Sequence, residues 1–159
     1  MNHNHFDNLD LKILGMLSEN ARKPYLEIAR ECGVSGAAVH QRIQKLTASG
    51  AIQGSECLIN PEAIGYQTCA YVGFFLRDPA QAQNVIEEIK KIPEIVECHF
   101  TTGPYTMLIK LYVRDNEHLM ELLNKKIQMI HGVTGTETLI SLDQSIKREI
   151  PVHLEDDEQ

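Results

Sequence analysis

The chain has 159 residues, of which 43% are hydrophobic, and 15 Lys and Arg stand against 22 Asp and Glu for a net charge of −7. This composition is typical of a globular protein of one or two small domains and argues against a disordered or fibrous chain. No apolar run approaches the roughly 20 residues of a membrane helix, and the first residues lack the apolar core of a signal peptide, so we expect a cytoplasmic protein with no membrane partner.

The charge is unevenly distributed along the chain. Residues 1–60 carry six basic and six acidic groups, residues 61–150 carry nine and twelve, and residues 151–159 carry only four acids. Binding to nucleic acid requires a local surplus of Lys and Arg. The neutral first third can still present a basic face to DNA, whereas the acidic tail at 151–159 is expected to be solvated.

Three helices are predicted in the first fifty residues. They cover residues 7–17, 24–32 and 35–49, where apolar residues recur at helical spacing between capping residues. A short turn containing Gly33 joins the second helix to the third, and small Ala29 four residues earlier lets the two helices approach closely. This spacing is typical of a helix-turn-helix, with a plain three-helix bundle without a DNA partner as the structural alternative.

The segment after the third helix predicts a wing. Residues 51–59 read as a turn followed by alternating apolar and polar residues, which favours a strand packed behind the third helix. Residues 60–66 then form a connector. We therefore place a winged helix-turn-helix DNA-binding domain at residues 1–54 and a strand and hinge linker at residues 55–67.

The second half of the chain predicts the order strand, helix, strand, strand, helix, strand. The segments are 68–76, 79–91, 96–102, 106–113, 116–130 and 134–142. Two similar strand-helix-strand units with right-handed crossovers form a ferredoxin-like βαββαβ sheet domain, which we place at residues 68–150, ahead of the acidic tail at 151–159. The fold class is α+β. The first and third strands are apolar on both faces, so we expect a homodimer in which a second sheet covers the open face.

Segments in both halves resemble one protein family in the right order. They are FDNLDLKIL at 6–14, IA at 28–29, GVS at 33–35, RIQKL at 42–46, GAIQG at 50–54, LINP at 58–61 and VECHFTTG at 96–103. The chain resembles the Lrp/AsnC family of bacterial and archaeal transcription regulators over nearly its whole length. The resemblance implies a regulator that binds double-stranded DNA and senses an amino acid or a related small molecule through its C-terminal domain. It also implies dimers that assemble into an octamer or another higher oligomer.

In a helix-turn-helix the second helix of the pair lies in the major groove, so the side of residues 35–49 opposite its apolar stripe faces DNA. The residues on or beside that side are Ser35, Gly36, Ala37, His40, Gln41, Gln44 and Lys45. Gln41 and Gln44 can bond an adenine edge, and His40 can bond a purine edge. Ala37 can touch a thymine methyl, and Lys45 can reach a phosphate.

Four further positions near this helix bear on DNA binding. Gly36 stands where the family usually has proline, which loosens the first turn of the helix. Arg42 adjoins the inner face and has two interpretations, a clamp on a phosphate or a structural partner of an acid. Arg22 and Lys23 precede the second helix where a phosphate could approach, with a solvated loop as the alternative.

The predicted effector site is the turn between the second and third strands. It contains Thr101, Thr102, Gly103, Pro104, Tyr105 and Thr106, and the last strand adds Thr136 and Thr138, which can equally be ordinary strand formers. Gly103 lets the backbone offer N–H groups to a carboxylate. Family members that respond to amino acids commonly carry aspartates where this chain has Pro104 and Thr106. An effector ammonium would lose its anionic partner, so we expect weak amino-acid binding, a different effector or none.

Two other function classes remain open from the sequence. One is an enzyme of the siroheme or tetrapyrrole decarboxylase type on the same fold. Such enzymes use histidine in the sheet domain, where this chain has His99, His118 and His131. No catalytic or metal-ligand spacing accompanies them, and Cys32, Cys57, Cys69 and Cys98 form no C-x-x-C pair, so we predict no catalytic residue, metal or cofactor. The other is a sensing or assembly protein that does not bind DNA.

Overall fold

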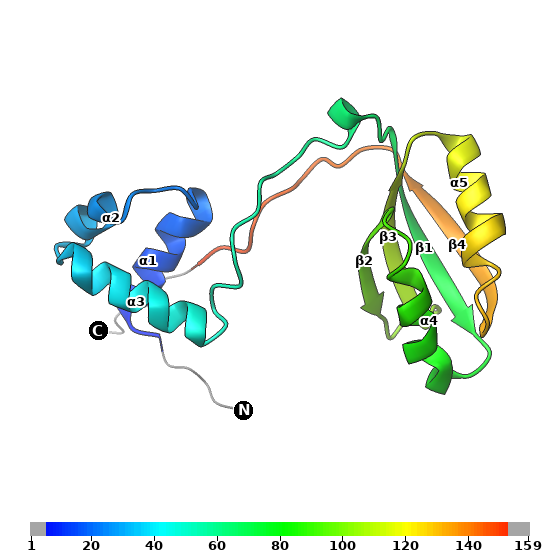
Figure 1. Ribbon diagram of the computed structural model, residues 1–159, viewed down its shortest axis with the longest axis horizontal. Helices are drawn as coiled ribbons and strands as arrows, with labels where there is room; N and C mark the ends of the chain where they lie inside the picture. The colour runs from blue at the N-terminus through cyan, green and yellow to red at the C-terminus, as the bar shows by residue number, and fades with distance from the viewer. Residues whose placement is uncertain (1–5, 153–159) are drawn as a thin grey trace. The chain divides into compact units, whose positions relative to one another are not determined.

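The computed structural model describes residues 6–152, which fall into two compact units (Figure 1). The described residues up to Leu58 belong to the first unit together with those from Ile146 onward, and Ile59–Ser145 form the second. Each unit has a separate hydrophobic core.

The first unit contains the three predicted helices, α1 (Asn8–Glu19), α2 (Tyr25–Cys32) and α3 (Gly36–Ala48). Asp7 caps α1 in a capping box with Asp10, and the Ser35 hydroxyl oxygen accepts a 3.2 Å hydrogen bond from the Ala38 N–H at the start of α3. Gly33 ends α2 in the left-handed conformation, with φ of +68°. The buried core residues come from all three helices: Ile13, Ile28, Ala29, Val39, Ile43 and Leu46. The helix-turn-helix prediction is confirmed.

The predicted wing strand at residues 51–59 is wrong for the described part of the chain. Ile52 packs against the helical core, and its N–H donates to the Leu46 carbonyl at 3.2 Å, but residues 53–60 are exposed and form no ladder. An alternating sequence becomes a strand only when a second strand accepts its hydrogen bonds. Within residues 6–152 no such partner pairs with this segment.

The second unit is a four-stranded antiparallel sheet. Its strands are β1 (Thr68–Leu76), β2 (Ile95–Phe100), β3 (Met107–Val113) and β4 (Val133–Ser141), in the order β2-β3-β1-β4. The helices are α4 (Ala82–Ile89) and α5 (Asn116–Leu122), which continues as a π-helical turn over Leu123–Ile127, and short 3-10 turns cover Glu62–Ile64 and Pro79–Gln81. The predicted ferredoxin-like order is confirmed.

The two faces of this sheet differ. The helices α4 and α5 cover one face, where Ala70, Val72 and Phe74 of β1 join the core (Figure 1). Residues that alternate with these, including Tyr71 and Phe75, point to the other face, which no element among residues 6–152 covers within this unit. The apolar pattern on both faces thus leaves one apolar surface open.

Candidate nucleic-acid interface and effector site

The side of α3 opposite the core is exposed. Val39, Ile43 and Leu46 are buried, whereas the predicted DNA-facing residues Ala37, His40, Gln41, Gln44 and Lys45 are exposed. The His40 and Gln44 side chains are hydrogen-bonded, with their Nε2 atoms 3.1 Å apart. The ring of Tyr25, which sequence reasoning missed, lies 6.0 Å from the His40 ring, so α2 contributes an aromatic side chain to this surface. The sequence signal for this contact was an aromatic residue directly after Pro24, at the start of the predicted second helix.

Gly36 at the start of α3 lies against the Leu26 side chain of α2. A Cβ at this position would stand 3.1 Å from the Leu26 Cδ2 atom, which is tighter than ordinary van der Waals contact. A larger residue would require the end of the Leu26 side chain, which is 69% exposed, to move by a few tenths of an ångström. The glycine at the first position of α3 fits the packing of this particular helix pair, and the Ser35 cap restrains the helix start.

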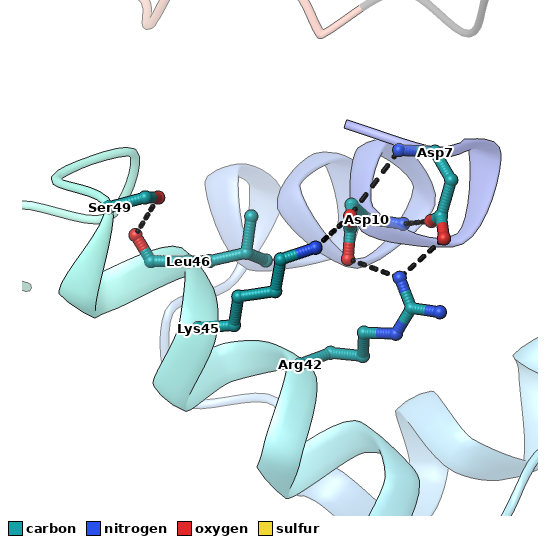
Figure 2. A network of polar contacts seen from close by, with 6 residues as sticks. All are labelled: Asp7, Asp10, Arg42, Lys45, Leu46 and Ser49. Atoms are coloured by element: carbon teal, nitrogen blue, oxygen red, sulfur yellow. Dashed lines mark hydrogen bonds and ion pairs between the residues drawn. The ribbon is translucent and has the colours of Figure 1, made fainter. Parts of the chain in front are cut away.

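Arg42 is a partner of two acids. Its Nη1 atom hydrogen-bonds the Asp7 carboxylate and lies 3.0 Å from Asp10 Oδ1 (Figure 2). Of the two interpretations that the sequence left open, the structure shows the ion pair. Hydrogen bonds from the Asp10 backbone N–H and from Arg42 hold the pKa of Asp7 below its ordinary value. The hydrogen bond to Asp7, and to a lesser extent the one to Asp10, raises the pKa of Arg42. Lys45 approaches the same group, with Nζ 3.9 Å from Asp10 Oδ2.

The two basic residues before α2 have different surroundings. Lys23 Nζ lies 2.8 Å from a Glu31 carboxylate oxygen, and this hydrogen bond raises the pKa of Lys23. Lys12 Nζ donates to the Glu31 carbonyl at 3.1 Å. Arg22 is exposed and forms no ion pair with any residue in 6–152. Glu31 therefore draws Lys23 toward the domain, and Arg22 stays available on the surface.

Hydrogen bonds within the predicted effector turn and to β1 hold the turn in place. The Thr101 hydroxyl donates to the Tyr105 carbonyl at 2.6 Å, and the Thr106 N–H donates to the Phe74 carbonyl at 2.9 Å. Thr102, Gly103 and Pro104 are exposed, and a Cβ on Gly103 would touch nothing within 4 Å. The exposed polar groups that a ligand can reach are therefore those of Thr102, Gly103 and Pro104 at the tip of the turn.

Tyr105 ties the turn to the open face of the sheet. Its ring lies over Gly73, where a Cβ would stand only 2.4 Å from ring carbons, and it contacts Phe75 edge-on at 5.5 Å between centroids. The neighbouring Glu137 carboxylate raises the pKa of Tyr105. Sequence reasoning missed Glu137, although its alternation with Thr136 and Thr138 placed it on the opposite face of that strand.

The predicted effector residues are not brought together on one face. Thr136 pairs with Phe74 and Thr138 pairs with Val72, so both threonines share the helix-covered face, where Gln128 Nε2 lies 3.3 Å from the Thr136 hydroxyl. Tyr105 lies on the opposite face. Within one chain Thr136 and Thr138 therefore lie on the face opposite the Tyr105 ring, because cross-strand register decides which face a β4 residue joins.

The described residues contain no cluster of three metal-binding side chains, and none of their helices is long and apolar enough to cross a bilayer. Of the histidines considered above, His118 lies 3.3 Å from Glu94 Oε1 and His99 lies 3.4 Å from a Glu97 oxygen, whereas His131 is exposed on the turn before β4. The three do not form one group.

Comparison with known proteins gives matches to both units. The model of the AsnC-type helix-turn-helix domain matches residues 6–47, and that of the Lrp/AsnC ligand binding domain matches residues 69–151. The regulatory protein AsnC of Haemophilus influenzae is 38% identical over 93% of this chain and 98% of its own. The structure of Escherichia coli AsnC has a TM-score of 0.87 at 35% identity, covering 92% of this chain and 98% of that one. The feast or famine regulatory protein of Mycobacterium tuberculosis, solved with L-methionine, has a TM-score of 0.87 at 26% identity over 94% and 100%.

Proposed function

Because the chain belongs to the Lrp/AsnC family of DNA-binding transcriptional regulators, which are not enzymes, we propose that the exposed side of α3 reads an operator in the major groove. The observation that carries this proposal is the division of α3 into a buried stripe and an exposed polar side. Gln41 and Gln44 offer amides to adenine edges, His40 faces a purine edge, and Ala37 faces a thymine methyl. Such a protein would act in the cytoplasm, and the decarboxylase alternative has no support.

Binding requires more than one helix-turn-helix. A domain with equal numbers of acids and bases releases few counterions from DNA, so a single copy gives little affinity. We infer that the open sheet face pairs two chains as a homodimer, and that dimers assemble further into an octamer or another higher oligomer. Two copies would then contact successive grooves, with half-sites about 10 bp apart or at multiples of that spacing.

The effector proposal rests on the turn at residues 101–106. The M. tuberculosis relative was solved with L-methionine, which supports a small amino-acid-like effector for this chain. Pro104 and Thr106 give the turn no carboxylate, and Glu137, which pairs with Gly73 under the Tyr105 ring, is the acid beside it. We propose that an effector carboxylate meets the N–H groups at the tip of the turn and that common α-amino acids bind weakly.

Selection of genomic fragments bound by the full chain, with and without each amino acid, tests both proposals. We expect enrichment of fragments with repeated half-sites and small effects of common amino acids. Gln41→Ala should weaken operator binding about fivefold or more, the lower end for one bidentate base contact. Gln53→Ala removes an exposed amide outside α3 and serves as the control. If no duplex is enriched in a salt-sensitive way, the chain is an assembly protein and the operator proposal fails.

A further inference from the structure

We propose that Arg42 and Lys45, two cations of neighbouring turns on α3, have different roles in DNA binding. The contact that each cation makes with the buried Asp10 carboxylate determines its role. Arg42 is a positioning residue that fixes α3 against α1, and Lys45 is the cation that passes to a DNA phosphate. The inference rests on the proposed DNA binding, and it resolves the role of Arg42 within it.

The burial of Asp10 is the first step. Its side chain is only 1% exposed, and its carboxylate receives the Asp7 N–H at 3.3 Å and Arg42 Nη1 at 3.0 Å. A carboxylate shielded from water stays ionised only beside a cation and hydrogen-bond donors. If the Arg42 guanidinium moved from Asp10 to a DNA phosphate, the nearest remaining cation would be Lys45 Nζ, 3.9 Å from Asp10 Oδ2. This transfer is therefore strongly unfavourable.

Arg42 is held from two sides. The guanidinium also bonds Asp7, whose own carboxylate accepts the Asp10 N–H at 2.8 Å as the cap of α1 (Figure 2). The first turn of α1 and the middle of α3 are therefore joined through one side chain, which is 33% exposed. A change in this contact alters how α3 lies on its own domain, and hence how its outer side meets base edges.

Lys45 is held more loosely. Its side chain is 63% exposed, and its Nζ lies at the limit of an ion pair from Asp10. An exposed pair of this kind adds little stability in water, so a phosphate can compete for the ammonium. Because Arg42 continues to neutralise Asp10, the Lys45 ammonium can move to a phosphate while the buried carboxylate keeps a counter-charge. The same carboxylate thus retains one cation and releases the other.

Salt dependence of binding to a random duplex separates the two roles, because its slope counts phosphate contacts. We expect Lys45→Gln in the full-length protein to reduce the slope of log K against log salt by about 0.9 for each copy bound, while Asp7→Asn, which keeps Arg42 on Asp10, leaves it unchanged. Arg42→Gln should instead lower the ratio of operator to random affinity about fivefold or more, as for one lost base contact, with partial rescue by Arg42→Lys.

Asp7→Asn gives a milder test in case Arg42→Gln does not fold. Asn still caps α1, and buried Asp10 keeps Arg42, so the domain is expected to fold. In Asp7→Asn the ratio of operator affinity to random-duplex affinity should fall, while the slope of log K against log salt stays unchanged. The control Glu19→Gln makes the same charge change at the far end of α1 and should leave the affinity ratio unchanged. A loss of slope in Asp7→Asn as large as in Lys45→Gln, or no loss in Lys45→Gln, overturns the inference. A wild-type protein without salt-sensitive binding refutes the proposed function itself.

Discussion

Gly73 is the residue on which the position of Tyr105 depends. Side chains on β1 alternate between the core and the open face, and Gly73 leaves a gap on the open face that the Tyr105 ring fills. The ring in turn reaches Phe75 and Glu137. One absent side chain therefore decides where the effector turn rests on the sheet.

Gly73→Ala should destabilise the protein. The new Cβ would stand 2.4 Å from ring carbons of Tyr105, so the ring must move, at a cost of about 1–3 kcal/mol as for an overpacked core. Urea unfolding measures the change. Gly135→Ala is the matched control on the neighbouring strand, where the Cβ would stand 3.7 Å from Phe75 in ordinary contact and the change should stay within about 0.5 kcal/mol. Equal effects at the two glycines would contradict the packing of Tyr105 on Gly73.

At the scale of elements, helices and strands differ in how far the sequence predicts them. Caps and C-caps are local, so Asp7, Gly33 and Ser35 mark the ends of α1, α2 and α3 directly. A strand depends on a distant partner. The alternation at 51–59 therefore predicted a wing that the described chain does not form, while β1 to β4 form because they pair with one another.

Ser35→Ala removes the cap of the recognition helix. The Ala38 N–H loses its acceptor, so the free energy of unfolding should fall by about 1 kcal/mol in a denaturation experiment that follows helical circular dichroism. Ser18→Ala is the control, because the Ser18 hydroxyl bonds the Gly15 carbonyl within α1 and alanine is a better helix former. A loss of stability in Ser18→Ala as large as in Ser35→Ala would argue against the cap.

At the scale of the whole molecule, the open sheet face is the feature that calls for a second chain. Phe75 and Leu139 are exposed there, and Lys110 lies among them, with its Nζ 3.2 Å from Glu97 and over the rings of Tyr71 and Tyr112. Burial raises the pKa of Glu97, but hydrogen bonds from Lys110 and His99 outweigh it and lower the pKa. A paired charge of this kind can lie within an otherwise apolar interface.

Leu139→Glu tests the proposed homodimer. Leu139 pairs with Tyr71 on the open face and is 50% exposed, so a glutamate there would carry an uncompensated charge into the interface. Sedimentation equilibrium should show a dimer dissociation constant raised at least about tenfold, the equivalent of 1.4 kcal/mol. Met120→Glu changes a 56% exposed residue of α5 and should leave the dimer intact. Dissociation by the Met120 variant alone would place the interface on the helical side.

The order of the elements, the helix-turn-helix and the family could be predicted before the fold was known, because periodicity, caps and short motifs are local properties of the chain. Which distant side chains meet depends instead on how the folded chain packs. Arg42 joined Asp7 and Asp10 across more than thirty positions, and the register of β1 with β4 put Glu137 beside Tyr105 while sending Thr136 and Thr138 to the other face. Alternation tells which residues share a face of one strand, but the pairing of strands and the packing of helices decide which faces come together.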